Sequence, residues 1–314
     1  MIKQHLQTSE PIYKEMWNDA LTGIRKHLIT YSKRSKLTVL AERPRGLDGP
    51  LNPKMDHLTC FLPGSIALGA TGGLPLHVAK QSPSWTRQQD EEMLLAEELT
   101  KTCWAMYRFM RTGLAPEIAY FQTDKPPKTM EEIYPPGQTK LESVSDDLDS
   151  DDRSQWGWRE DVNIHRQDRH NLQRPETVES LFYMYRITGD EMYREWGWEI
   201  FKAFVKHTAL VDFDYHHRRA SSPDDDGPDA STRTNGRIVG FTSLDNAHTI
   251  PPLRRDNMEG FWMSETLKYL YLLFSDRDFV SLEDHVFNTE AHIFPKFQPG
   301  GELKTGWTRT PPEQ

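Results

Sequence analysis

The feature that most constrains this chain is the 3.6-residue recurrence of its apolar residues, which is the period of an α-helix. This recurrence predicts amphipathic helices over residues 12–31, 57–69, 87–111, 175–188, 190–208 and 257–274. Only two short stretches, 118–121 and 238–241, have the composition of strands. The pattern therefore predicts an all-α fold of packed helices, with a few short strands in loops.

Two polar segments rich in Asp, Ser, Pro and Gly separate these helices and are predicted to be long loops, over about 123–160 and 212–256. Each contains an acidic run, at 146–152 and at 224–227. Neither run fits a calcium-binding loop, because the first lacks the central glycine and the second lacks a glutamate six residues after Gly227. We expect both runs to be solvated.

Composition excludes some classes of function. The chain has a mean hydropathy of −0.72 and no apolar run near the roughly 20 residues that a membrane span needs. We therefore expect no membrane segment in this chain, and its first residues lack the apolar core of a secretory signal. The net charge of −9, with Lys and Arg scattered along the sequence, argues against nucleic acid as a partner.

Cys60 and Cys103 are the two cysteines of the chain, and each lies in an apolar helical pattern. On this evidence they are either buried free thiols or one disulfide. No Cys-x-x-Cys is present, and neither cysteine has the neighbours that a zinc site requires.

The start of the 175–188 helix brings two carboxylates and a guanidinium together. Pro175 marks the first turn, Arg174 precedes it, and Glu176 and Glu179 share one helix face. Acidic residues at this end of a helix offset its dipole, which is the simpler interpretation. A reactive carboxylate is the alternative.

Seven motifs, in this order, cover almost the whole chain: KMDHLTCF (54–61), TGLAPE (112–117), DRHN running into RPETVES (168–180), ITGD (187–190), WGWE (196–199), MEGFWMSETLKY (258–269) and FNTEAH (287–292). In these motifs the chain resembles glycoside hydrolase family 47, the class I α-1,2-mannosidases that trim high-mannose N-glycans. The resemblance implies an (α/α)7 toroid of helical hairpins. Residues 1–314 would form a single, partial toroid domain in which the N-terminal hairpins are missing.

The resemblance also implies roles for individual residues. Glu176 would be the general base of an inverting hydrolysis, and Thr289 would bind Ca²⁺. Cys60 and Cys103 would form the disulfide of the family, which implies folding in the lumen of the endoplasmic reticulum or Golgi. The residues expected to contact mannose are Arg174, Glu179, His57, Phe261, Glu265 and Glu290. For Phe261, plain core packing is the alternative.

One departure from the family matters. The catalytic acid of the family lies in a Phe-Glu-Thr segment that does not occur here, and a further catalytic aspartate precedes a stretch whose end resembles residues 1–3. We therefore expect this chain to be the C-terminal part of the catalytic domain, inactive alone and monomeric when complete. The alternatives are a non-catalytic relative that binds mannose glycans, a truncated inactive paralogue, or a helical scaffold related only in fold.

Overall fold

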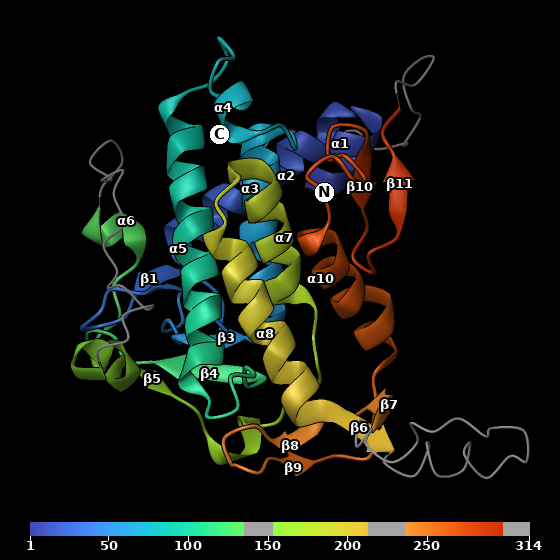
Figure 1. Ribbon diagram of the computed structural model, residues 1–314. Coiled ribbons are helices and arrows are strands. Elements are labelled where there is room, and N and C mark those ends of the chain that lie inside the picture. Colours follow the sequence, from blue (N-terminus) through green and yellow to red (C-terminus); the bar gives the residue numbers. More distant parts are fainter. Residues whose placement is uncertain (135–152, 213–235, 298–314) are drawn as a thin grey trace, which may run out of the picture.

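The computed structural model describes residues 1–134, 153–212 and 236–297, and its framework is helical as predicted (Figure 1). The α-helices are α1 (Ile2–Thr8), α2 (Pro11–His27), α3 (Leu62–Thr71), α4 (Leu76–Ala79), α5 (Arg87–Phe109), α6 (Met130–Ile133), α7 (Glu176–Thr188), α8 (Met192–Thr208) and α10 (Leu267–Phe274). Three 3₁₀ segments, η1 (His57–Phe61), η2 (Arg153–Asp161) and η3 (Arg166–Asp168), and one π-helical turn, η4 (Trp262–Thr266), complete the helical elements of the described residues.

Helix α7 is the centre of the fold. It packs against α3, α5, α8 and α10, and its residues from Glu176 to Ile187 are all buried (Figure 1). The approach of α3 is closest at Gly64, where an added Cβ would lie 2.7 Å from the ring of Tyr183. The Gly64 amide donates a hydrogen bond of 3.0 Å to Ser180 Oγ, which joins the two helices. The first turn of α7 is therefore held rigidly from several sides.

Within the described ranges the strands form five small antiparallel sheets. They pair as β1 (Ile29–Tyr31) with β2 (Thr38–Leu40); β4 (Ile118–Phe121) with β3 (Lys54–Asp56) and β5 (Val162–Asn163); β6 (Ala209–Asp212) with β7 (Arg237–Phe241); β8 (Leu244–Asn246) with β9 (Leu253–Arg254); and β10 (His285–Phe287) with β11 (Ile293–Pro295). The two predicted strands, at 118–121 and 238–241, are confirmed. The others have only two to four residues each, too few to show an alternating pattern.

Several predicted boundaries need correction. The helix predicted over 12–31 ends at His27, because residues 29–31 pair with β2 instead. The helix predicted over 57–69 begins as the 3₁₀ segment η1 and ends at Thr71. Helix α1 was not predicted, and η4 and α10 together begin at Trp262 rather than at residue 257.

The two predicted loops are only partly loops. The segment 212–256 includes β7, β8 and β9, and the segment 123–160 includes α6 and most of η2. The strand predicted at 238–241 lies inside the second segment, and the other short elements of the two segments were not predicted. The acidic runs at 146–152 and 224–227 lie outside the described residues.

One segment, His57–Ala79, is long and apolar enough to cross a membrane by length and composition. Of its most apolar window, 56% is buried inside the fold. Core helices meet the same criteria, so the expected absence of a membrane segment stays a prediction.

Candidate functional site

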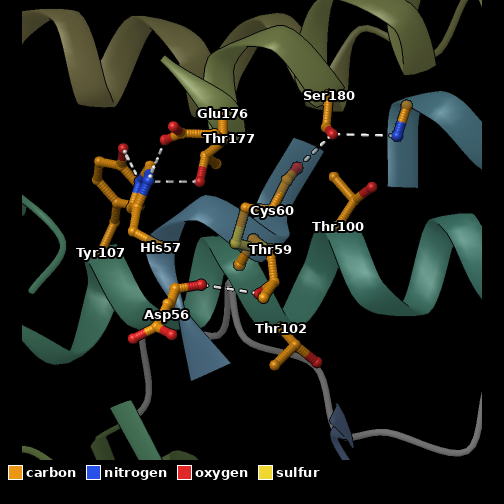
Figure 2. Close-up of a disulfide and its surroundings, with 12 residues drawn as sticks. Asp56, His57, Thr59, Cys60, Thr100, Thr102, Tyr107, Glu176, Thr177 and Ser180 are labelled. Atoms are coloured by element: carbon orange, nitrogen blue, oxygen red, sulfur yellow. Dashed lines mark hydrogen bonds and ion pairs between the residues drawn. A yellow bond between two sulfur atoms is a disulfide. The ribbon is translucent and has the colours of Figure 1, made fainter. Parts of the chain in front are cut away.

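Glu176, predicted from the sequence to be the general base, is the first residue of helix α7. Its side chain is buried, and Oε2 lies 2.8 Å from Nδ1 of His57. The other ring nitrogen of His57 lies 2.9 Å from the hydroxyl of Tyr107 and 3.2 Å from that of Thr177 (Figure 2). With a proton on Nδ1, His57 donates to Glu176, and its Nε2 shares a hydrogen bond with the hydroxyl of Tyr107, so the carboxylate is held in one orientation.

The electrostatic surroundings keep Glu176 ionised. Burial acts to raise the pKa of Glu176, but the hydrogen bond and charge of His57 lower it by more. The Glu176 backbone amide and the charge of Arg174 act in the same direction, so the pKa lies below its usual range. A buried, ionised carboxylate at neutral pH is suited to accept a proton.

Arg174 lies beside this carboxylate and is itself fixed in place. Its Nε donates to Oε2 of Glu117, while Oε1 of Glu117 accepts from the amide of Leu172 at 2.9 Å. The guanidinium lies over the ring of Phe261, 5.6 Å from the centroid. Phe261 is only partly buried and is not a member of the buried core cluster, so plain core packing does not describe it.

Glu179 lies one turn further along the same helix face and has a partner from the start of the chain. Lys3 Nζ donates to Glu179 Oε1 at 2.5 Å and lies 5.3 Å from the centroid of the Tyr183 ring. Burial raises the pKa of Glu179, and the charge of Lys3 opposes that rise. The ammonium of Lys3 therefore helps to keep a deeply buried carboxyl ionised.

Glu265 projects from η4 towards the same group of carboxyls. Its pKa is raised to about 7, first by burial and then by the negative charges of Glu176, Glu179 and Glu290. Near neutral pH it is therefore partly protonated, and it can donate as well as accept a hydrogen bond.

Thr289 and Glu290 lie in the exposed turn between β10 and β11, where Asn288 Oδ1 accepts from the amides of Glu290 and His292. Within the described residues, no group of three or more His, Cys, Asp or Glu side chains could hold a metal ion. A site built on Thr289 would instead use a hydroxyl, a backbone carbonyl and water, which are oxygen donors suited to calcium.

Cys60 and Cys103 form a disulfide, with their Cα atoms 5.9 Å apart, and both are buried (Figure 2). The pairing expected from the family resemblance is confirmed, and the free-thiol alternative is wrong. The bond joins η1, which carries His57, to α5, which carries Tyr107. It therefore fixes the position of η1, and with it His57, relative to the helix whose Tyr107 contacts the histidine ring.

Four residues of this site were not singled out from the sequence: Lys3, Tyr107, Glu117 and Thr177. Glu117 ends the TGLAPE motif and Thr177 follows Glu176, so both lay inside recognised motifs. Lys3 and Tyr107 had no local signal, since their partners are 176 and 50 residues away.

The model of glycosyl hydrolase family 47 matches residues 1–296. The chain belongs to this family. It is 42% identical to a mannosyl-oligosaccharide 1,2-alpha-mannosidase of Candida albicans over 98% of this chain and 46% of that protein. It is 38% identical to the endoplasmic reticulum mannosyl-oligosaccharide 1,2-alpha-mannosidase of Saccharomyces cerevisiae, over 98% of this chain and 49% of the relative.

Among solved structures, an alpha-1,2-mannosidase from Trichoderma reesei superposes with a TM-score of 0.63 at 22% identity, over 94% of this chain and 50% of that one. The structural similarity confirms the predicted α/α toroid class, and the family match excludes a scaffold related only in fold. This glycosyl hydrolase family 47 chain spans about half the length of the curated relatives it matches.

Proposed function

We propose that this chain forms the part of an inverting α-1,2-mannosidase that carries the general base, and that the complete enzyme removes terminal mannose from high-mannose N-glycans. The observation that carries the proposal is the geometry of Glu176. This buried carboxylate is held by His57 at 2.8 Å, and its lowered pKa keeps it ionised, and so able to accept a proton, at neutral pH.

In the proposed reaction, Glu176 takes a proton from a water molecule that attacks the anomeric carbon. His57 orients the carboxylate. The positive charge of Arg174 stabilises the ionised form of the carboxylate, and the guanidinium takes no part in the proton transfer. A carboxylic acid on the opposite face of the sugar protonates the leaving oxygen, about 6.5 to 9.5 Å from the base in inverting enzymes. We propose that this acid lies in the family segment that the present sequence lacks.

The remaining residues are proposed to form the sugar subsite. Phe261, braced by Arg174, supplies an apolar wall against the ring face, and Glu179 and Glu265 bind hydroxyls. Because the pKa of Glu265 is about 7, its carboxyl can either donate a hydrogen bond to a substrate hydroxyl or accept one from it. Glu290, in the turn beside Thr289, completes the acidic side of the site.

Calcium is proposed as the cofactor, held through the hydroxyl and carbonyl oxygens of Thr289. Two observations fit such an ion. Thr289 is exposed in its turn, so its oxygens are accessible. Besides burial, the negative charges of Glu176, Glu179 and Glu290 all raise the pKa of Glu265, so these carboxylates create a negative potential that attracts a cation. A bound Ca²⁺ would supply positive charge that orients substrate hydroxyls and water. The disulfide and the names of the relatives support action in the lumen of the secretory pathway.

The test is a chimera in which the upstream half of the Candida albicans relative is fused to residues 1–314. The chimera is expected to release mannose from a high-mannose glycan, and EDTA is expected to suppress that release. Glu176→Gln should lower kcat by at least about a hundredfold, because it removes the base but keeps the shape. Glu195→Gln, at an exposed carboxyl of α8, is the matched control and should leave kcat within about twofold.

Residues 1–314 tested alone are expected to bind the glycan without releasing mannose. Mannose release by this chain alone would show that it has its own acid. An active chimera that tolerates Glu176→Gln would refute the assignment of the base. Glycan binding without turnover in both proteins would favour the alternative of a non-catalytic relative.

A further inference from the structure

A cavity of about 700 Å³ lies between the C-terminal halves of α5 and α8, and Arg159 of η2 and Ile250 complete its lining. Figure 1 shows these two helices side by side. We call this cavity the basic groove, after the cationic side chains that line it: Arg108, Arg111, Arg159, Lys202 and Lys206. None of them belongs to the candidate mannose site.

The charge of the basic groove is opposite to that of the whole chain, which carries −9. Among the residues that the structure describes, one carboxylate lines the groove, Glu199, and it is already paired with Lys202 at 2.7 Å. Arg111 and Lys206 are exposed, and no carboxylate among the described residues pairs with either. The cations are scattered in the sequence, so composition did not reveal them, but the fold gathers them at one place.

Burial and nearby positive charges lower the pKa values of two histidines at the edge of the basic groove. Burial lowers the pKa of His207, and the positive charges of Lys206 and Arg254 lower it further. The pKa of His248 is lowered by burial and then by Arg169, Arg111 and Arg159. Arg111 and Lys206 therefore bring positive charge to the groove and its edge that no carboxylate of the described residues neutralises.

The groove is also partly preorganised. Arg159 donates to the backbone carbonyls of Phe109 and Arg108, and its guanidinium lies over the rings of Phe109 and Trp158, at 5.7 and 5.1 Å from their centroids. A guanidinium fixed in this way loses little side-chain entropy when it receives a ligand.

From this geometry we infer that the basic groove binds a phosphate or sulfate monoester of a small organic molecule. Guanidinium groups match the oxygens of such anions in bidentate hydrogen bonds, and lysines add point charges. The volume exceeds what one inorganic anion needs, and the partly buried Phe109 gives the organic part an apolar contact. Inorganic phosphate shares the chemistry but leaves most of the cavity to water.

The groove is close to the candidate mannose site without being part of it. Tyr107 lines the groove, and its hydroxyl lies 2.9 Å from Nε2 of His57, the ring that holds Glu176. The inference does not depend on the proposed mannosidase activity, because binding is measured directly.

The experiment is calorimetric titration of residues 1–314 with glucose 6-phosphate, inorganic phosphate and glucose at low ionic strength. Glucose is chosen because the candidate sugar site is expected to select mannose. We expect saturable binding of glucose 6-phosphate, weaker binding of phosphate and none of glucose. Raising the ionic strength from about 0.05 to about 0.5 M should weaken the binding.

Variants locate the site. Arg111→Gln combined with Lys206→Gln should weaken binding at least about tenfold, because each loses a charge-assisted hydrogen bond. Lys26→Gln combined with Lys33→Gln removes the same charge from exposed positions elsewhere and should leave affinity within about twofold. Arg111→Lys combined with Lys206→Arg should retain most of the affinity, which separates loss of charge from loss of folding.

The inference is overturned if glucose 6-phosphate shows no saturable binding at millimolar concentrations. Equal weakening by the two charge-removing pairs would overturn it as well, since the ligand would then respond only to net charge. Binding of glucose as strong as that of the ester would show that the phosphate is not recognised.

Discussion

Replacement of Lys3 by methionine tests the buried ion pair at the centre of the fold. The side chains of Lys3 and Glu179 are only 18% and 5% exposed, and their charged atoms lie 2.5 Å apart. Methionine keeps most of the apolar stem but leaves Glu179 without its countercharge. Loss of one partner of a buried pair costs about 3 to 5 kcal/mol, so we expect the free energy of unfolding to fall by about 3 kcal/mol at pH 7.

The pH dependence follows from the raised pKa of Glu179. Burial already holds this pKa above the usual value, and loss of the Lys3 charge raises it further. A carboxyl with a raised folded-state pKa binds its proton more tightly in the folded state, so stability falls as pH rises from about 4.3 through that pKa. The deficit of the Lys3→Met variant should therefore shrink as pH falls from 7 towards 4.5.

The assay is urea unfolding followed by tryptophan fluorescence at pH 7 and pH 5, with Lys26→Met as the control at an exposed lysine. The control should change stability by less than about 0.5 kcal/mol. Adding Glu179→Gln to Lys3→Met should recover at least about 1 kcal/mol, because the buried charge is then gone. A Lys3→Met variant no less stable than the control, or a deficit equal at both pH values, would refute the reasoning.

Three further outcomes are expected. Cys60→Ser with Cys103→Ser should lower the free energy of unfolding by about 4 kcal/mol in urea unfolding, because the disulfide closes a loop across 43 residues; a change below about 1 kcal/mol would contradict this. Gly197→Ala should cost about 1 to 3 kcal/mol, because the added methyl would overlap a buried leucine. Gly23→Ala, where the added methyl meets nothing within 4 Å, should instead stabilise the folded chain by about 0.5 to 1 kcal/mol. Similar changes in unfolding free energy for the two variants would show that the space around the glycine does not determine the effect. In the active chimera, His57→Gln should shift the acid limb of the pH profile of kcat/KM upwards by about one pH unit or more. The reason is that the carboxylate of Glu176 loses a hydrogen bond to its charged form, which raises its pKa. An acid limb that does not move would contradict the role of the histidine.

Local sequence was sufficient for the central helices. Helix α7 ends at the predicted residue and begins at Glu176, one residue after the predicted Pro175, and α5 begins at the predicted residue and ends two residues early. Gly189 follows α7 in a left-handed conformation, as a helix-terminating glycine should. These features depend on residues within one or two turns of each other, so the sequence carries them without tertiary information.

The family motifs identified most residues of the candidate site, but not the partner residues that fix their side chains in place. The RPETVES motif pointed to Arg174, Glu176 and Glu179, and the structure adds the partner of each: Glu117, His57 and Lys3. These pairs join residues 57, 119 and 176 positions apart, and no local periodicity encodes such distances.

The sequence by itself determined the helical class, the main helix boundaries and the family, because each is written in short-range patterns. The tertiary structure decided the short strands, the charge state of Glu176 and Glu265, and the gathering of Arg111 and Lys206 at one groove. The physical reason is common to all three. Strand pairing, burial and electrostatic potential are sums over neighbours in space, and those neighbours are set only when distant segments pack together.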